Sequence, residues 1–343
     1  MMRAVIKEEI GPGHLKLTER PVPQTGPNDV LVKVMATALC GTDAHIQHWN
    51  DWAAKRVKPG VIIGHEFAGE VVEVGAEVKT VKVGDIVSAE THIVCNACDL
   101  CHNGYEHVCY NTLTIGVGRD GCFAEYIAIP AENAFICDPS LSIEVLSMME
   151  PLGAAVHGVM EFPVAAKNVA IIGAGPIGAM AVAVAKQVGA SRVICLEPNQ
   201  MRAEMAKKMG ADHVLDPLAA DPVEAVKALT PEGRGVDVVI DYSGNSGAVA
   251  TSLGYAKPEA KIVVVGIASK PISFDLGEFV YSGKVLKGIA GRLMYQTWEQ
   301  TRGLLAGGLD VGPVITHVLP LEKYQEGLDL MERGECGKVI LKP

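Results

Sequence analysis

Four closely spaced cysteines are the feature of this chain that most limits what it can fold into. They follow the pattern C-x2-C-x2-C-x7-C, at Cys95, Cys98, Cys101 and Cys109. Four thiolates at this density are the ligand set of a closed, tetrahedral zinc site. Because four protein ligands leave no position for a substrate, we assign this site a structural role, worth roughly 10 kcal/mol or more to local folding.

The composition is that of an ordinary two-domain globular protein. At 343 residues the chain is longer than a single hydrophobic core usually serves. Its net charge of −10 argues against nucleic-acid binding, which requires a basic face. The N-terminus lacks the apolar core of a signal peptide, and the most apolar stretch, 169–188, is interrupted by glycine and proline, so no membrane span is predicted. Nine cysteines in such a chain favour a reducing cytoplasm, where clustered thiols bind metal.

The chain changes character near Pro151. Before it, short β-branched runs broken by glycine and proline predict a lobe that resembles a coiled β-barrel. After it, strands and helices alternate, which predicts a doubly wound parallel sheet. The predicted strands are 168–172, 192–196, 213–215, 236–241, 261–266 and 285–289, with helices at 176–188, 200–209, 222–229 and 246–256. We therefore predict a catalytic domain over 1–150, a nucleotide domain over 151–291, and a return segment over 292–343 that completes the first domain.

A glycine-rich turn follows the first of these strands. Gly173, Gly175 and Gly178 form G-x-G-x-x-G between a buried strand and a helix, which is the context that dinucleotide binding requires. The first glycine permits the turn, the second admits the pyrophosphate to the helix N-terminus, and the third allows close packing. Glu197 ends the next strand, where a carboxylate accepts ribose hydroxyls of NAD and repels the extra phosphate of NADP. Arg202 argues for the opposite preference, but we favour NAD because the carboxylate stands at the strand tip.

A second metal site is indicated upstream of the quartet. Cys40 and His65 supply a thiolate and an imidazole, and Glu66 or Glu150 supplies a carboxylate. Three protein ligands leave one position for water or a substrate oxygen. A zinc ion with an open position is a Lewis acid that lowers the pKa of an alcohol and so favours release of hydride.

Polar residues near Cys40 suggest a path for the released proton. Thr42 followed by His45 places a hydroxyl and then an imidazole next to the predicted ligand, so these two side chains form a plausible relay. Asp43 either orients His65 through its second ring nitrogen or caps the helix that follows Cys40.

Taken together, these motifs resemble the zinc-containing medium-chain dehydrogenase/reductase superfamily over the full length of the chain. The resemblance implies a Rossmann domain joined to a GroES-like coiled β-barrel catalytic domain. Within the superfamily, the chain is most similar to the threonine-oxidising members, through three segments. These are Cys40 to Ile46 continuing to Trp52, Glu90 to Cys95, and Gly288 to Arg292 with Thr297-Trp298.

The resemblance implies a reaction and a set of contacts. The reaction is the oxidation of L-threonine at C3 by NAD to 2-amino-3-oxobutanoate, in a homotetramer with two zinc ions per chain. The catalytic zinc is expected on Cys40, His65 and Glu66, with Glu150 nearby and able to exchange with water. His92 and Arg292 are expected near the substrate. The implied NAD contacts include Ile177, Glu197, Arg202, Val265, Gly266, Ile267, Ile289 and Ala290. The chain departs from the family at Ala154, where Asn is common, and at Ala290, where Tyr or Thr is usual.

Two other functions are compatible with parts of this pattern. A polyol or vicinal-diol dehydrogenase would use the same chemistry. It would differ from a threonine-oxidising enzyme only in the residues that bind the ammonium and carboxylate groups of threonine. A non-catalytic, zinc-stapled NAD sensor would require a broken open site, yet all of its expected ligands are present.

Overall fold

The computed structural model describes residues 1–268 and 270–343 and divides them into two compact units. The first unit contains Met1–Pro151, Leu293–Trp298 and Ile315–Pro343. The second contains Leu152–Arg292 and Glu299–Val314. The sequence predicts that residues 292–343 belong to the first domain as one segment. In the structure this segment is divided, because Glu299–Val314 belong to the second unit. No helix within the described ranges is long and apolar enough to cross a membrane.

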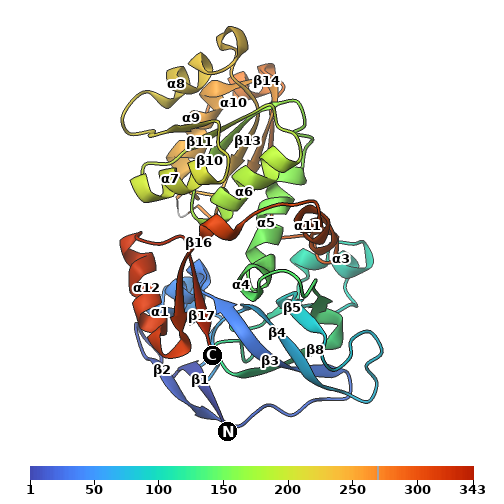
Figure 1. Cartoon of the computed structure of the whole chain (residues 1–343). Coiled ribbons are helices and arrows are strands. Elements are labelled where there is room, and N and C mark those ends of the chain that lie inside the picture. The colour runs from blue at the N-terminus through green and yellow to red at the C-terminus, as the bar shows by residue number, and fades with distance from the viewer. Residues whose placement is uncertain (269) are drawn as a thin grey trace. The chain divides into compact units, whose positions relative to one another are not determined.

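The first unit contains a seven-stranded sheet, most of whose strands are labelled in Figure 1, and two two-stranded sheets. The order of the large sheet is β16-β17-β3-β4-β5-β9, and β8 pairs with β3; the small sheets are β1-β2 and β6-β7. Its strands are β1 (Met2–Lys7), β2 (Leu15–Arg20), β3 (Asp29–Ala38), β4 (Glu66–Val74), β5 (Ile86–Ala89), β6 (His92–Ile93), β7 (Leu113–Thr114), β8 (Tyr126–Pro130), β9 (Ala134–Ile136), β16 (Ile315–Pro320) and β17 (Lys338–Lys342). Its helices are α1 (Gly41–His48), α2 (Asp51–Ala54), α3 (Asp99–His102), α4 (Ile143–Leu146) and α12 (Tyr324–Arg333). Short 3-10 turns lie at Glu106–Val108, Ala131–Asn133 and Leu321–Lys323.

The second unit is a doubly wound sheet of six parallel strands. Its order, β12-β11-β10-β13-β14-β15, reverses direction beside β10, which is the arrangement of a Rossmann fold. Helices α6 and α7 pack together, as do α8 and α9, as expected when crossovers cover both faces. The strands are β10 (Asn168–Ile172), β11 (Arg192–Leu196), β12 (His213–Leu215), β13 (Val236–Asp241), β14 (Ala256–Val264) and β15 (Val285–Gly288). The helices are α6 (Pro176–Gln187), α7 (Gln200–Lys208), α8 (Pro222–Ala228), α9 (Ser246–Tyr255) and α10 (Leu276–Tyr281).

Two longer helices have residues in both units along the chain: α5 (Met149–Met160) and α11 (Gln296–Ala306). Short 3-10 turns also occur at Pro231–Gly233 and Gly312–Val314. Each unit has its own core of apolar side chains, one around Phe67 and Phe123 and the other around Ile194 and Ile262. The predicted fold class, a Rossmann sheet domain and a β-rich domain in one chain, is therefore confirmed.

Candidate metal centres and nucleotide site

The four cysteines of the quartet come together in the first unit. The sulfur–sulfur distances are 3.5 Å for Cys98–Cys101 and Cys95–Cys109 and 3.9 Å for Cys98–Cys109. Zinc–sulfur bonds of about 2.3 Å in a tetrahedron require sulfurs roughly 3.8 Å apart, so the four side chains fit zinc. The amide of Ala97 is the main cause that lowers the pKa of the Cys95 thiol to about 6, which favours the thiolate.

The second predicted ligand set also converges. One ligand atom from each of Cys40, His65 and Glu66 lies within 4.8 Å of the others. His65 and Glu66 are buried, and Nδ1 of His65 and Oε1 of Glu66 have no hydrogen-bond partner in the described part of the chain. Buried polar atoms are normally satisfied, so these two are suited to a cation. Thiolate, imidazole and carboxylate are all ligands of catalytic zinc.

The local sequence explains how these ligands are presented. Cys40 precedes the first turn of α1, and its amide donates to Oδ2 of Asp43 at 2.9 Å, so Asp43 caps the helix as one of the two predicted roles requires. His65 follows Gly64, whose φ is +87°. A Cβ on Gly64 would lie 2.1 Å from the ring of Phe123, so only glycine can make this turn against the core.

A lysine that the sequence analysis missed completes the surroundings of Glu66. Lys338 is 3% exposed and Glu66 is fully buried, and the two form an ion pair. Its Nζ also donates to the carbonyl of Leu39 at 2.8 Å. Burial raises the pKa of the Glu66 carboxyl well above its ordinary value, and the Lys338 ammonium opposes this rise. A lone basic residue in the last strand gives no signal from sequence alone.

Glu150 and the two relay residues lie around this group. Oγ1 of Thr91 donates to Oε1 of Glu150 at 3.4 Å, and the Glu150 charge acts on both Cys40 and Glu66. Glu150 is not one of the three clustered ligands. Thr42 Oγ1 lies 3.8 Å from the Cys40 sulfur. His45 is exposed, with its Nδ1 3.0 Å from Asn50 Nδ2.

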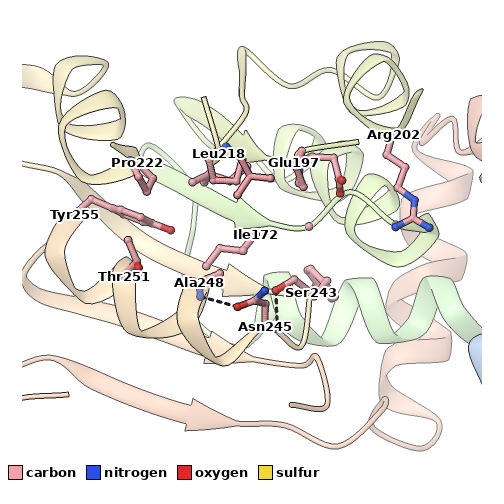
Figure 2. A pocket seen from close by; sticks show the side chains of 16 residues that line it. Ile172, Glu197, Arg202, Leu218, Pro222, Ser243, Asn245, Ala248, Thr251 and Tyr255 are labelled. Carbon is pink, nitrogen blue, oxygen red and sulfur yellow. Dashed lines mark hydrogen bonds between the residues drawn. The ribbon is translucent and has the colours of Figure 1, made fainter. Parts of the chain in front are cut away.

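The nucleotide site forms a pocket of about 520 Å³ in the second unit (Figure 2). Of the predicted contacts, the pocket is lined by Gly173, Gly175, Glu197 and Arg202. The side chains that the sequence analysis missed are Leu218, Ser243, Asn245, Thr251 and Tyr255, among others. The polar run 243–246, directly after a buried strand and before a helix, was a usable signal for Ser243 and Asn245.

The glycine-rich turn has the form that the motif predicted. A Cβ on Gly178 would lie 2.0 Å from the carbonyl oxygen of Gly173, so helix and turn pack too closely for any side chain there. A Cβ on Gly175 would meet no atom within 4 Å, so this glycine faces open space at the N-terminus of α6, where an anion is stabilised. The nucleotide pyrophosphate fits this arrangement.

The carboxylate of Glu197 is held in the lining of the same pocket. It is 5% exposed, and its two oxygens accept hydrogen bonds from the amides of Ala174 at 2.7 Å and Asn199 at 2.9 Å. Nε of Arg202 is buried without a hydrogen-bond partner among the described residues. Both side chains therefore suit a ligand that brings hydroxyl and phosphate groups.

The remaining predicted contacts lie outside the lining of this pocket. Among the residues not in the lining are Ile177, Gly178, Val265, Gly266, Ile267, Ile289 and Ala290. Ile267 is 96% exposed, whereas Arg292 is 2% exposed. His92 lies in β6 of the first unit and keeps 25% side-chain exposure.

Two family models match most of the chain. The family described as zinc-binding dehydrogenase matches residues 176–307, and the alcohol dehydrogenase GroES-like domain matches residues 26–138. The L-threonine 3-dehydrogenase of Caldanaerobacter subterraneus is 47% identical over 100% of this chain and 99% of its own length. The solved structure of an alcohol dehydrogenase from Thermus sp. is 29% identical with a TM-score of 0.91, covering 99% of each chain. That of a 2R,3R-butanediol dehydrogenase from Bacillus subtilis is 25% identical with a TM-score of 0.91, covering 100% of each chain. The chain therefore belongs to the family of zinc-binding dehydrogenases that includes the L-threonine 3-dehydrogenases.

Proposed function

We propose that this enzyme oxidises L-threonine at C3 to 2-amino-3-oxobutanoate and transfers the hydride to NAD. The observation that carries the proposal is the cluster of Cys40, His65 and Glu66, an open ligand set in a chain 47% identical to a protein named L-threonine 3-dehydrogenase. The glycine-rich pocket with a fixed Glu197 supports NAD as the hydride acceptor.

The catalytic metal would be held by Cys40, His65 and Glu66, and the structural metal by the cysteine quartet. When bound at the first site, zinc supplies Lewis acidity that lowers the pKa of a hydroxyl group. Lys338 pairs with Glu66, holds that carboxylate in place and opposes its protonation, which burial favours. Glu150, held by Thr91, adds a second negative charge that favours a cation at this position.

The hydroxyl proton must reach solvent for the reaction to proceed. Thr42 lies beside the Cys40 sulfur and carries a hydroxyl that can both accept and donate a proton. His45, one turn further along α1, is exposed and its Nδ1 is held by Asn50. We assign Thr42 and His45 as the relay, because the hydroxyl beside the Cys40 sulfur and the exposed imidazole further along α1 lead from the proposed metal site towards water.

A vicinal-diol substrate is the competing proposal. The observation that favours it is the likeness to the 2R,3R-butanediol dehydrogenase structure, at 25% identity. The relatives named for threonine are far more similar in sequence, at 40–48% identity. We therefore place threonine first.

Assembly and location complete the proposal. β15 lies at the edge of the parallel sheet, and the neighbouring α10 exposes Leu276, Val280 and Tyr281. An exposed strand edge beside apolar side chains suits pairing with a second copy, which supports the proposed homotetramer. The cytoplasm is supported by the cysteines of the described residues, which form no disulfide.

The test is NADH formation by zinc-loaded protein with L-threonine, sorbitol or 2,3-butanediol. A kcat/KM for L-threonine well above that for either polyol is the expected result. Faster turnover of a polyol would move the substrate and leave the hydride chemistry in place.

A further inference from the structure

Two segments that carry the closer resemblance, Glu90 to Cys95 and Thr297-Trp298, meet through one hydrogen bond. The indole Nε1–H of Trp298 donates to Oε2 of Glu90 at 2.9 Å. Both side chains are buried, each at 1% exposure. Neither belongs to a metal-ligand group, so the metal centres do not account for a buried carboxylate at this position.

The other oxygen of this carboxylate faces His92. Oε1 of Glu90 accepts a hydrogen bond from the His92 amide at 2.9 Å. The same oxygen lies 3.2 Å from Nδ1 of the His92 ring, although the angle there is not that of a hydrogen bond. Asn133 holds the same segment, since its Nδ2 donates to the carbonyls of Glu90 and His92 at 2.8 and 2.9 Å. The backbone around His92 is therefore held by the side chains of both Glu90 and Asn133.

The carboxylate also decides which nitrogen of His92 is available. A carboxylate only accepts hydrogen bonds, and an unprotonated ring nitrogen also only accepts, so the proton belongs on Nδ1, next to Glu90. Nε2 then carries the free lone pair. Because Nδ1 is buried while the side chain keeps 25% exposure, the exposed part of the ring is the part away from Glu90.

The same segment is tied to the proposed catalytic metal site. Thr91, between Glu90 and His92, donates to Glu150, whose charge acts on Cys40 and Glu66. His92 is thus the exposed nitrogen base in a segment bonded directly to the edge of that site.

We propose that Glu90 is a positioning residue that holds His92 with Nε2 as an acceptor for the ammonium group of a 2-amino-3-hydroxy acid. The substrate hydroxyl would lie at the Cys40–His65–Glu66 group, two carbon atoms from the ammonium. This inference rests on the proposed function and adds to it a reason why an amino alcohol is preferred over a diol.

The test is Glu90→Gln, assayed with L-threonine and with 2-butanol, which lacks the ammonium group. The side chain introduced by this substitution has one oxygen and one NH2 group in place of two oxygens. Its NH2 group must therefore face the N–H of either Trp298 or His92, and one of the two hydrogen bonds that hold the segment is lost. An unsatisfied buried donor changes an equilibrium by roughly 10- to 100-fold, and we expect a loss of that size in kcat/KM for L-threonine, mainly through KM. The kcat/KM for 2-butanol should change by less than about twofold, and zinc content and NADH binding should be retained.

Two further variants keep the test decisive. Glu132→Gln removes the charge of an exposed carboxylate of the same unit, which accepts from Nδ2 of Asn96 and acts electrostatically on Tyr295, and it should leave both substrates unaffected. His92→Ala should give the same loss confined to L-threonine even if Glu90→Gln fails to fold. An equal loss for both substrates in the Glu90 and His92 variants, or no loss, would overturn the positioning role. Wild-type protein that oxidises 2-butanol but not L-threonine would instead refute the proposed function.

Discussion

The ammonium group of Lys338 forms an ion pair with the carboxylate of Glu66, and both side chains are almost completely buried. Such a pair is costly to break from one side, because the remaining charge is left in a low-dielectric interior. The cation therefore opposes protonation of this carboxylate, which burial favours, and holds it next to Cys40 and His65.

Lys338→Met should destabilise the protein and weaken the proposed catalytic metal site. Removal of one partner from a buried pair costs about 3–5 kcal/mol, which would be measured as a lower free energy of unfolding in urea. Zinc content should fall from about two to about one per chain. Lys323→Met breaks an exposed pair with Glu326 and should cost less than about 1 kcal/mol. Equal effects of the two substitutions would contradict the importance of the buried pair.

This ion pair shows where sequence reasoning ends. The quartet and the Cys40 and His65 motifs were found because their ligand types and local spacing are distinctive. Lys338 approaches them only because β17 pairs with β3 in a register that sets Ile340 opposite Ala38. That register depends on the packing of the whole sheet and leaves no local mark in the sequence. The contact between Glu90 and Trp298 was missed for the same reason, although both segments were recognised.

The parallel sheet was easier to predict than the β-rich lobe. Four of its strands, 168–172, 192–196, 213–215 and 236–241, have the bounds that the sequence suggested. Three of them are mostly buried and stand out as short apolar runs between helices, whereas the edge strand 213–215 is partly buried. β14 begins at Ala256, five residues before the predicted start at Lys261, since Ala256 pairs with Val236 ahead of a register shift. The amphipathic helix α12 was not predicted.

Cys40→Ser should abolish turnover while the nucleotide site remains intact. The serine hydroxyl is a poor zinc ligand, so we expect kcat to fall by roughly 1,000-fold or more and one zinc ion per chain to be lost. NADH binding, followed by fluorescence titration, should be unchanged because the nucleotide pocket belongs to the second unit. Cys336→Ala, at a buried thiol outside both ligand groups, should retain both zinc ions. Retention of two zinc ions in Cys40→Ser would rule out Cys40 as a ligand.

Glu197→Ala should reduce the preference for NAD over NADP. The carboxylate lines the pocket and is fixed by two amides, so it would accept ribose hydroxyls and repel a 2′-phosphate. We expect the ratio of kcat/KM for NAD to that for NADP to fall by roughly tenfold or more. Glu204→Ala removes an exposed carboxylate on α7 and serves as the control. An unchanged ratio in Glu197→Ala would show that another residue selects the nucleotide.

A buried histidine makes the second unit sensitive to mild acid. His157 is 5% exposed, its Nδ1 lies 3.0 Å from the carbonyl oxygen of Gly291, and Glu161 and Lys287 are the charged groups around it. Burial lowers its pKa below the ordinary value of 6.5, against the opposing effects of the Gly291 carbonyl and Glu161. The unfolded chain therefore binds the proton more readily than the folded one. The corresponding stability is fully present above pH 6.5 and is lost as the pH falls towards the folded pKa.

His157→Asn should flatten this pH dependence, because asparagine offers an N–H in place of Nδ1 and does not titrate. Urea midpoints measured for zinc-loaded protein at about pH 7.5 and 5.5 should fall less in the variant than in the wild type. His213, in β12 of the same unit, supplies the matched control as His213→Asn, since its side chain is only partly buried. If the wild type and His157→Asn lose the same stability between the two pH values, protonation of His157 does not cause the loss of stability in acid. Release of zinc from the first unit in acid would then be the explanation to test.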